Sequence, residues 1–131
     1  MTIINPPSED IKDMLESSGS GLGLVTGTDL FIAIMPPEPN NVVVIRDSGG
    51  MNQLKYGMER PSVQIVVRNN EYKAGYEIVK DIKYYLEGKN GEIWNGTNYI
   101  SVINRSEIGF MGQDADNRFE WSVNFQIYRT A

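Results

Sequence analysis

Cysteine and histidine are both absent from this chain of 131 residues. Without cysteine there can be no disulfide and no thiolate nucleophile, and without either residue there can be no Cys/His zinc site. A Ser-His-Asp triad is excluded too, because it needs an imidazole. The lack of cysteine fits synthesis in a reducing cytoplasm. Much of nucleophilic and zinc chemistry is therefore closed to this protein.

Long apolar runs and an excess of positive charge are also missing. No stretch reaches the roughly 18 apolar residues that a membrane span needs, so we expect no membrane partner. Residues 1–10 lack the basic and apolar segments of a secretory signal, which makes the glycosylation-like triplets at Asn95 and Asn104 chance matches. The net charge of −5 does not favour capture of nucleic acid or anionic lipid.

The chain length and an apolar content of 40% predict a single domain over residues 1–131. We expect residues 1–23 to form an N-terminal helix and a flexible joint, and residues 24–131 to form an α+β core. The N-terminal helix is predicted over 6–17, with Ser8 as its cap. Its apolar stripe is short and must dock on another element; it consists of Ile11, Met14 and Leu15.

A second, longer helix is predicted over 70–88, with Asn70 as its cap and Gly88 at its end. Its apolar face consists of Ile78, Ile82, Tyr85 and Leu86, with Val79 beside it. The dipeptide Asn95-Gly96 then lies between alternating residues, which predicts a β-hairpin with a type I′ turn.

Alternating apolar residues bounded by turn signals predict further strands over 24–37 (with an irregularity at Gly27), 42–46, 61–69 and 119–129. The segments 47–60 and 105–118 have no clear period and are predicted to be surface loops, longer than the common length of about 4–6 residues. This order of elements predicts an α+β fold. We expect a mainly antiparallel, twisted sheet with one long helix and a short N-terminal helix packed on one face.

The final strand separates two kinds of side chain. Its expected core side, packed under the long helix, carries Phe119, Trp121, Val123, Phe125 and Ile127. Its other side is polar but nearly uncharged, and carries Glu120, Ser122, Asn124 and Gln126. A plain solvent face usually carries more charge, so the alternation alone leaves the use of this side open.

No motif in the chain predicts a catalytic, cofactor or metal site. The glycine-rich segment 19–24 follows a helix and enters a strand, the reverse of a phosphate loop. Residues 114–117 have the alternating acids of a calcium loop, but Phe119 stands where that loop needs glycine. The pairs Asp114 and Asp116, and Glu9 and Asp10, could suggest a general acid and base, but nothing in the sequence near them predicts a raised carboxylate pKa.

Arg68 and Arg118 each end or precede a predicted strand, and two interpretations remain open for them. Each can pair with a nearby acid such as Asp114, which contributes only about 0–1 kcal/mol when exposed. Alternatively, each can lock loops or subunits in place. The tyrosines predict a core edge or a protein interface rather than base stacking, because no basic groove accompanies them.

Several of these pieces together resemble the small tail-terminator (tail-completion) proteins of long-tailed bacteriophages, often labelled minor capsid proteins. The resemblance covers roughly residues 30–129. It rests on a Pro-x-x-Gln strand ending in Arg, a Tyr-bearing helix ending in Leu-x-Gly, and an Asp-x-x-x-Arg loop feeding a Ser-x-Asn-Phe strand. These are Pro61, Gln64, Arg68, Tyr72, Leu86, Gly88, Asp114, Arg118, Ser122, Asn124 and Phe125.

The resemblance implies a non-enzymatic virion protein without a cofactor, assembled in the host cytoplasm and located at the head–tail junction. Its implied form is a homo-oligomeric ring, usually a hexamer, that caps the tail tube and stops its growth. The implied partners are the tail-tube protein, a head connector or adaptor protein, and genomic DNA that passes through the lumen without specific binding. A related head–tail adaptor or tail-tube protein is an alternative. A nucleic-acid-binding or hydrolytic domain is another, which the acidity and the absence of histidine and cysteine disfavour.

The candidate subunit-interface or lumen residues are Gln64, Arg68, Tyr72, Asp114, Arg118, Ser122, Asn124 and Gln126. We also expect the segments 47–60 and 105–118, together with a mobile N-terminal segment, to contact neighbouring subunits or the tail tube.

Overall fold

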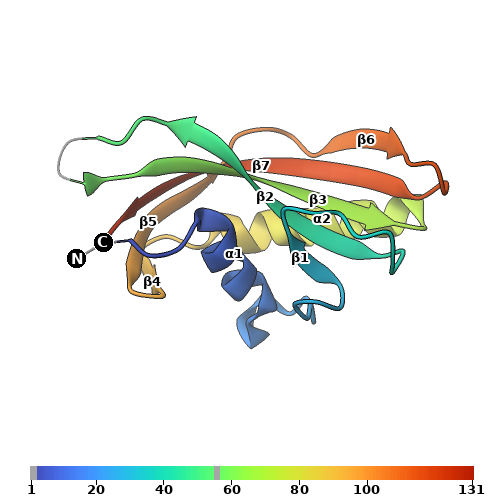
Figure 1. The fold of residues 1–131 in the computed structure, drawn as a ribbon, viewed down its shortest axis with the longest axis horizontal. Helices are drawn as coiled ribbons and strands as arrows, with labels where there is room; N and C mark the ends of the chain where they lie inside the picture. Colours follow the sequence, from blue (N-terminus) through green and yellow to red (C-terminus); the bar gives the residue numbers. More distant parts are fainter. Residues whose placement is uncertain (1–2, 55–56) are drawn as a thin grey trace.

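The computed structural model describes residues 3–54 and 57–131. Within them it contains two α-helices, a short 3₁₀ helix and seven strands that form one sheet (Figure 1). In chain order the elements are α1 Pro7–Glu16, η1 Ser18–Ser20, β1 Leu30–Ile32, β2 Val42–Met51, β3 Arg60–Asn69, α2 Tyr72–Glu87, β4 Glu92–Trp94, β5 Thr97–Asn104, β6 Gly109–Gln113 and β7 Phe119–Thr130. Neither described α-helix combines the length and the apolarity that crossing a bilayer requires.

The strand order of the sheet is β1-β2-β3-β7-β5-β4, and β6 pairs with the first part of β7. All pairs are antiparallel except β1 with β2. Both helices lie on the same side of the sheet, with α1 across β1 to β3 and α2 across β3, β7 and β5 (Figure 1). The predicted α+β class with a mainly antiparallel sheet is confirmed.

The hydrophobic core fills the space between these helices and one face of the sheet. Register places Ile45 beside Ile65, and Ile65 beside Val123, so the odd-numbered residues of three neighbouring strands share this face. Trp121, Val123, Phe125 and Ile127 belong to the core as predicted, whereas Phe119 is only partly buried. Burial of each such side chain stabilises the fold by about 1.5–3 kcal/mol.

The cap predicted for α1 is wrong. The helix begins at Pro7, and no side chain caps it. Ser8 lies inside the helix and is buried. Its backbone N–H and its hydroxyl both donate to the carboxylate of Asp47 on β2, at 2.9 and 2.6 Å, instead of capping the helix. The expectation of a mobile N-terminal segment is also wrong for this helix, since its apolar stripe is part of the core: Ile11, Met14 and Leu15.

The helix predicted over 70–88 is confirmed as α2, with a different start. Asn70 does not cap it; its backbone N–H donates to the side chain of Asn41 instead, at 2.9 Å. Val79, which we placed beside the apolar face, is fully buried, whereas Ile78 and Tyr85 are partly exposed.

Three strand boundaries differ from those predicted. The strand over 24–37 is wrong apart from β1, which pairs with β2 in parallel. The loop over 47–60 is wrong at both ends, because β2 continues to Met51 and β3 begins at Arg60; part of that segment, residues 55–56, lies outside the described residues. The hairpin has a register shift between Asp47 and Gly50. Gly50 has a φ of 108°, and a Cβ there would collide with the backbone of Arg60.

The loop predicted over 105–118 is wrong at residues 109–113, which form β6 against β7 with a bulge between Phe110 and Gly112. The predicted hairpin turn is confirmed. Asn95 and Gly96 link β4 to β5 with φ of 51° and 77°, the positive values that a type I′ turn requires.

Candidate functional site

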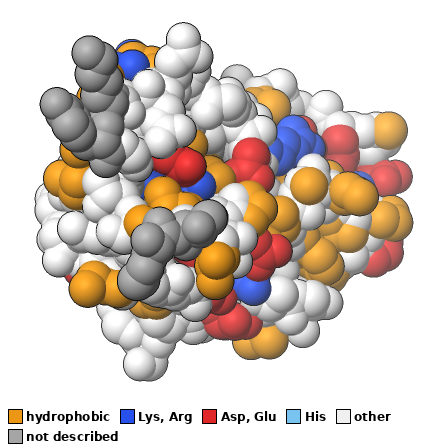
Figure 2. Space-filling model, turned by 60° about the vertical axis from the view of Figure 1, so that its left-hand side comes forward, with side chains coloured by type: hydrophobic (Ala, Val, Ile, Leu, Met, Phe, Trp, Pro, Cys, Tyr) orange, Lys and Arg blue, Asp and Glu red, His pale blue; other side chains and the backbone are white. Residues whose placement is uncertain are grey.

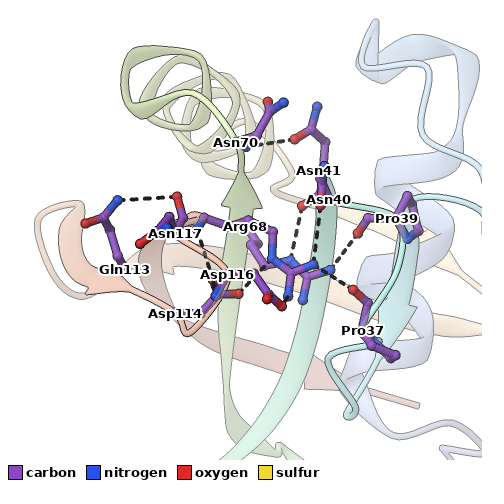
Figure 3. Close-up of polar contacts among 11 residues, drawn as sticks. Pro37, Pro39, Asn40, Asn41, Arg68, Asn70, Gln113, Asp114, Asp116 and Asn117 are labelled. Atoms are coloured by element: carbon purple, nitrogen blue, oxygen red, sulfur yellow. Dashed lines mark hydrogen bonds and ion pairs between the residues drawn. The ribbon is translucent and has the colours of Figure 1, made fainter.

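Two buried arginines fasten a loop to one end of the sheet (Figure 3). Arg68, at the end of β3, is 2% exposed and points away from the helices. Its guanidinium donates to the backbone carbonyls of Asn40 and Pro39, at 3.1 and 2.5 Å. Within the described residues it makes no ion pair shorter than 4 Å. Of the two interpretations of Arg68, the structure bears out the locking of a loop.

Arg118 fits both interpretations, because it pairs with an acid and also holds a loop. It donates to the carboxylate of Asp114 at 2.8 Å and to the carbonyl of Pro37 at 2.6 Å. Asp114 also accepts the backbone N–H groups of Asp116 and Arg118, which closes the turn before β7. The turn and the loop at Pro37 are thereby tied to one side chain.

Burial sets the electrostatics of this cluster. It lowers the pKa of Arg68, and the positive charge of Arg118 lowers it further, yet a guanidinium stays protonated because its ordinary pKa is so high. The backbone N–H of Arg118 is the main cause that lowers the pKa of Asp114 below its ordinary value. Arg68 and Asp114 are therefore both charged near neutral pH.

The outer face of the sheet, opposite the helices, is apolar at the same end. Val42, Val44 and Val66 point away from the helices and are still buried, at 2%, 0% and 1% exposure. They do not belong to the main core. Farther along the outer face, the partly exposed Gln64 lies between Arg46 and Asn124.

The polar residues of β7 do not form one uniform surface. Glu120, Ser122 and Asn124 are partly exposed, but Gln126 is 3% exposed. The amide of Gln126 donates to the carbonyls of Arg60 and Pro61, at 2.7 and 3.0 Å. Gln126 therefore ties β7 to β3 within the protomer. The partly exposed Asn124 instead donates its amide N–H to the hydroxyl of Ser106 at 3.1 Å.

Aromatic rings gather where the N-terminal end of α2 meets β6 and β7. The ring of Tyr72 lies 5.2, 5.5 and 4.9 Å from those of Phe110, Phe119 and Trp121. Tyr72 and Phe110 are 50% and 46% exposed, and Tyr76 joins them over Trp121. We call these five residues the aromatic face. Exposed, clustered aromatic rings are typical of protein interfaces.

At the other edge of the sheet, the β2–β3 hairpin extends past α1 (Figure 1). We call residues 46–51 and 59–62 the arm. Met51 is 40% exposed on it. Glu59 is bound to Arg129 of β7 by an ion pair of 2.8 Å and by two backbone hydrogen bonds, which hold the outer end of the arm to β7.

A buried polar network fastens α1 to the sheet. Asp10, fully buried, lies 3.7 Å from the guanidinium of Arg129 and accepts a hydrogen bond from the hydroxyl of Tyr99. Asn95 donates to the same carboxylate at 2.7 Å. Burial is the main cause that raises the pKa of Tyr99, and the hydrogen bond to Asp10 raises it further. All of these groups are mutually satisfied, so the network is suited to holding structure.

A hollow of about 250 Å³ lies between α2, the segment before β1 and the start of β2. Leu22, Leu24 and Ile78 make it partly apolar, and Asp29 and Asp81 lie at its wall. Asp29 already accepts the backbone N–H of Val25. Within residues 3–54 and 57–131, no three acidic side chains gather as a metal site would require.

The structure brings together three of the residues singled out from sequence, Arg68, Asp114 and Arg118. Gln64, Ser122 and Asn124 share the outer face with them, Gln126 is enclosed, and Tyr72 lies in the aromatic face. Their role in an interface or a lumen stays a prediction. Phe110 was missed, because it falls in a segment whose glycines and bulge hide the strand period.

Comparison with known proteins finds a matching family and similar solved structures. A family model described as "Bacteriophage tail terminator protein" matches residues 20–130. Among solved structures, the fold is similar to a chain of the "Virion of native gene transfer agent (GTA) particle", with a TM-score of 0.72 and 12% sequence identity over 95% of this chain and 94% of that one. Identity this low shows likeness of fold alone. No curated protein matches the chain.

Proposed function

Because the chain belongs to the bacteriophage tail terminator proteins, a family of structural virion proteins, we propose that it forms a ring that caps the tail tube, ends tube growth and joins the tail to the head. The observation that carries this proposal is the family match, which spans the whole sheet and α2. The resemblance noted from the sequence favours six subunits.

The distribution of surfaces is compatible with a ring. The aromatic face and the arm are different surfaces at opposite edges of one sheet. A cyclic assembly uses head-to-tail contacts between two unlike surfaces, and it closes when the rotation between subunits divides a circle. A ring of this kind ends growth if only one of its two faces fits the tube.

The charge pattern suits a passage for DNA. The chain has a net charge of −5, and Figure 2 shows a face on which acidic, basic and apolar side chains are interspersed without a continuous basic stripe. Affinity for DNA comes largely from rows of Lys and Arg that neutralise phosphates. We assign Gln64, Ser122 and Asn124 to the lumen or to a sister subunit, where hydrogen bonding is useful and a strong grip on phosphate is not.

The proposed function has no catalytic step. The protein acts by shape and by complementary surfaces. Arg68 and Arg118 hold the loop at Pro37 and Pro39 rigid at one end of the sheet. Rigid contact residues lose less conformational entropy on association.

The test is to purify the protein, measure its mass by light scattering after size exclusion, and image it by electron microscopy. We expect rings that bind the ends of tail tubes. A strict monomer at high concentration that ignores tube ends would overturn the proposal. Deleting the gene separates this role from its relatives: a terminator's loss gives overlong tails or unjoined heads and tails, whereas loss of a tube protein gives no tails.

A further inference from the structure

The free edge of β6 combines apolar side chains with an unpaired acid. Within the described residues β6 pairs only with β7, so its other edge is open. Phe110 and Met111 are 46% and 49% exposed there. Glu107, just before the strand, is exposed and has no cation within 4 Å among the described residues. This edge therefore presents apolar surface with a negative charge beside it.

The arm presents the opposite combination. Its edge is open because β1 pairs with β2 only as far as Ile45. The exposed Met51 lies beside Arg60, whose guanidinium contacts the sulfur of Met51 at 3.7 Å and the carbonyl of Asn52 at 2.9 Å. Arg60 and Arg46 have no carboxylate within 4 Å in the described part of the chain.

The acids of the arm are already engaged inside the protomer. Glu59 pairs with Arg129 at 2.8 Å, and Asp47 accepts two hydrogen bonds from Ser8. The arginines of the arm are thus its available charges, as Glu107 is the available charge beside β6. Charges of opposite sign on two contact surfaces favour their association and fix its orientation.

We infer that the β6 edge of one copy, with Phe110, Met111 and Glu107, is the seat for the arm of the next copy. This inference rests on the proposed ring and names the surfaces that build it. Met51 packs against the exposed rings, since a thioether makes favourable contacts with aromatic edges. Arg60 pairs with Glu107 at the rim of this contact.

The two surfaces cannot meet within one molecule. In the strand order, β2 and β6 lie on opposite sides of β3 and β7, and Figure 1 places β6 and the arm at opposite ends. Each copy thus offers one seat and one arm. Register shifts between Asp47 and Gly50 and between Phe110 and Gly112 break the regular hydrogen-bonding edge of both strands, so the contact is made by side chains rather than by a continuous sheet.

Two single variants test the two surfaces separately. Met111→Asp places a charge in the seat, and Arg60→Glu reverses the charge of the arm; both positions are at least partly exposed, so both variants should fold. We expect each alone to lose the ring and run as a monomer. The matched controls are Ile93→Asp, another exposed apolar position, and Lys80→Glu, an exposed cation outside both surfaces, and both should keep the ring. Thermal melts confirm folding of all four.

Mixing the two variants is the decisive measurement. Met111→Asp keeps an intact arm and Arg60→Glu keeps an intact seat, so together they form one good contact and then stop. We expect a species of twice the 14.7 kDa protomer mass and no ring. In a single chain, Glu107→Arg combined with Arg60→Glu should restore the ring.

The outcomes separate the inference from the proposed function. If the wild type forms rings and the two variants do so equally, the seat and the arm are wrongly assigned while the ring stands. A mixture that stays monomeric, although each variant is folded, also overturns the assignment. A wild type that forms no ring overturns both.

Discussion

Replacement of Arg118 by alanine should loosen one end of the molecule without unfolding it. The side chain is 8% exposed and makes two short charge-assisted contacts, to Asp114 at 2.8 Å and to the carbonyl of Pro37 at 2.6 Å. Its loss detaches the loop at Pro37 from the turn before β7. Arg68 still holds the neighbouring carbonyls of Pro39 and Asn40.

The magnitude follows from those two contacts. A hydrogen bond to a charged group contributes about 1.5–3 kcal/mol. Asp114 keeps access to water, because 21% of its side chain is exposed. The free-energy cost of removing its hydrogen bond to Arg118 should therefore lie near the low end of that range. We expect a decrease of about 2–4 kcal/mol in the free energy of unfolding. At about 4 °C per kcal/mol for a chain of this size, the Tm should fall by roughly 8–16 °C.

The assay is urea unfolding at neutral pH followed by tryptophan fluorescence. Trp121 lies a few residues along β7 and reports on this end of the sheet. Arg105→Ala is the matched control, because Arg105 is exposed and its only hydrogen bond in the described part of the chain comes from its backbone, to Asn124 at 2.9 Å. Its effect should stay within about 0.5 kcal/mol. If Arg118→Ala is no more destabilising than this control, the locked loop does not contribute to stability.

Three further predictions address the core, the turn and the buried network. Trp121→Ala should cost roughly 3–5 kcal/mol and Asn124→Ala about 0–1 kcal/mol, because the first is buried and the second partly exposed; chemical denaturation showing the reverse order would mean that the faces of β7 are reversed. Because the pKa of Asp114 is lower in the folded protein than its ordinary value of 3.8, its ionised carboxylate stabilises the fold above pH 3.8, and this contribution is lost as the pH falls through the folded pKa. The midpoint of urea unfolding, measured from pH 7 to pH 2, should therefore depend less on pH in Asp114→Asn than in the wild type. Identical pH profiles of the two proteins would refute the ionised turn. Tyr99→Phe should cost about 1–3 kcal/mol in a thermal melt, because buried Asp10 loses a donor; an unchanged Tm would show that the network does not hold α1.

Local patterns predicted those parts of the fold whose causes are local. The alternation of β7, the amphipathic period of α2 and the Asn95-Gly96 turn depend on neighbours within a few residues, and all three are confirmed. β6 escaped prediction because two glycines and a bulge occupy a five-residue strand. Nothing in its own sequence marks it, since β7 supplies its pairing.

The candidate site was predictable in part for the same reason. The pairing of Asp114 with Arg118 spans four residues and follows from their spacing, whereas the bond of Arg118 to Pro37 spans 81. Ser8 shows the limit most clearly: its type and position fit a helix cap, but Asp47, which lies 39 residues away, takes its hydrogen bonds. Gln126 likewise has the alternation of a surface amide, but its amide donates to the carbonyl of Arg60 at the start of β3, which lies far away in the sequence.

The position of β7 within the sheet has a consequence for synthesis on the ribosome. It follows the other strands of this sheet in the sequence, yet it lies between β3 on one side and β5 and β6 on the other. Until it emerges, β3 lacks one neighbour, β5 and β6 have no common support, and Asp10 has no Arg129 beside it. The nascent chain therefore cannot complete its core early, and the aromatic face, which needs Phe119 and Trp121, forms only once translation has passed them. Chains that end before that point therefore lack the finished aromatic face.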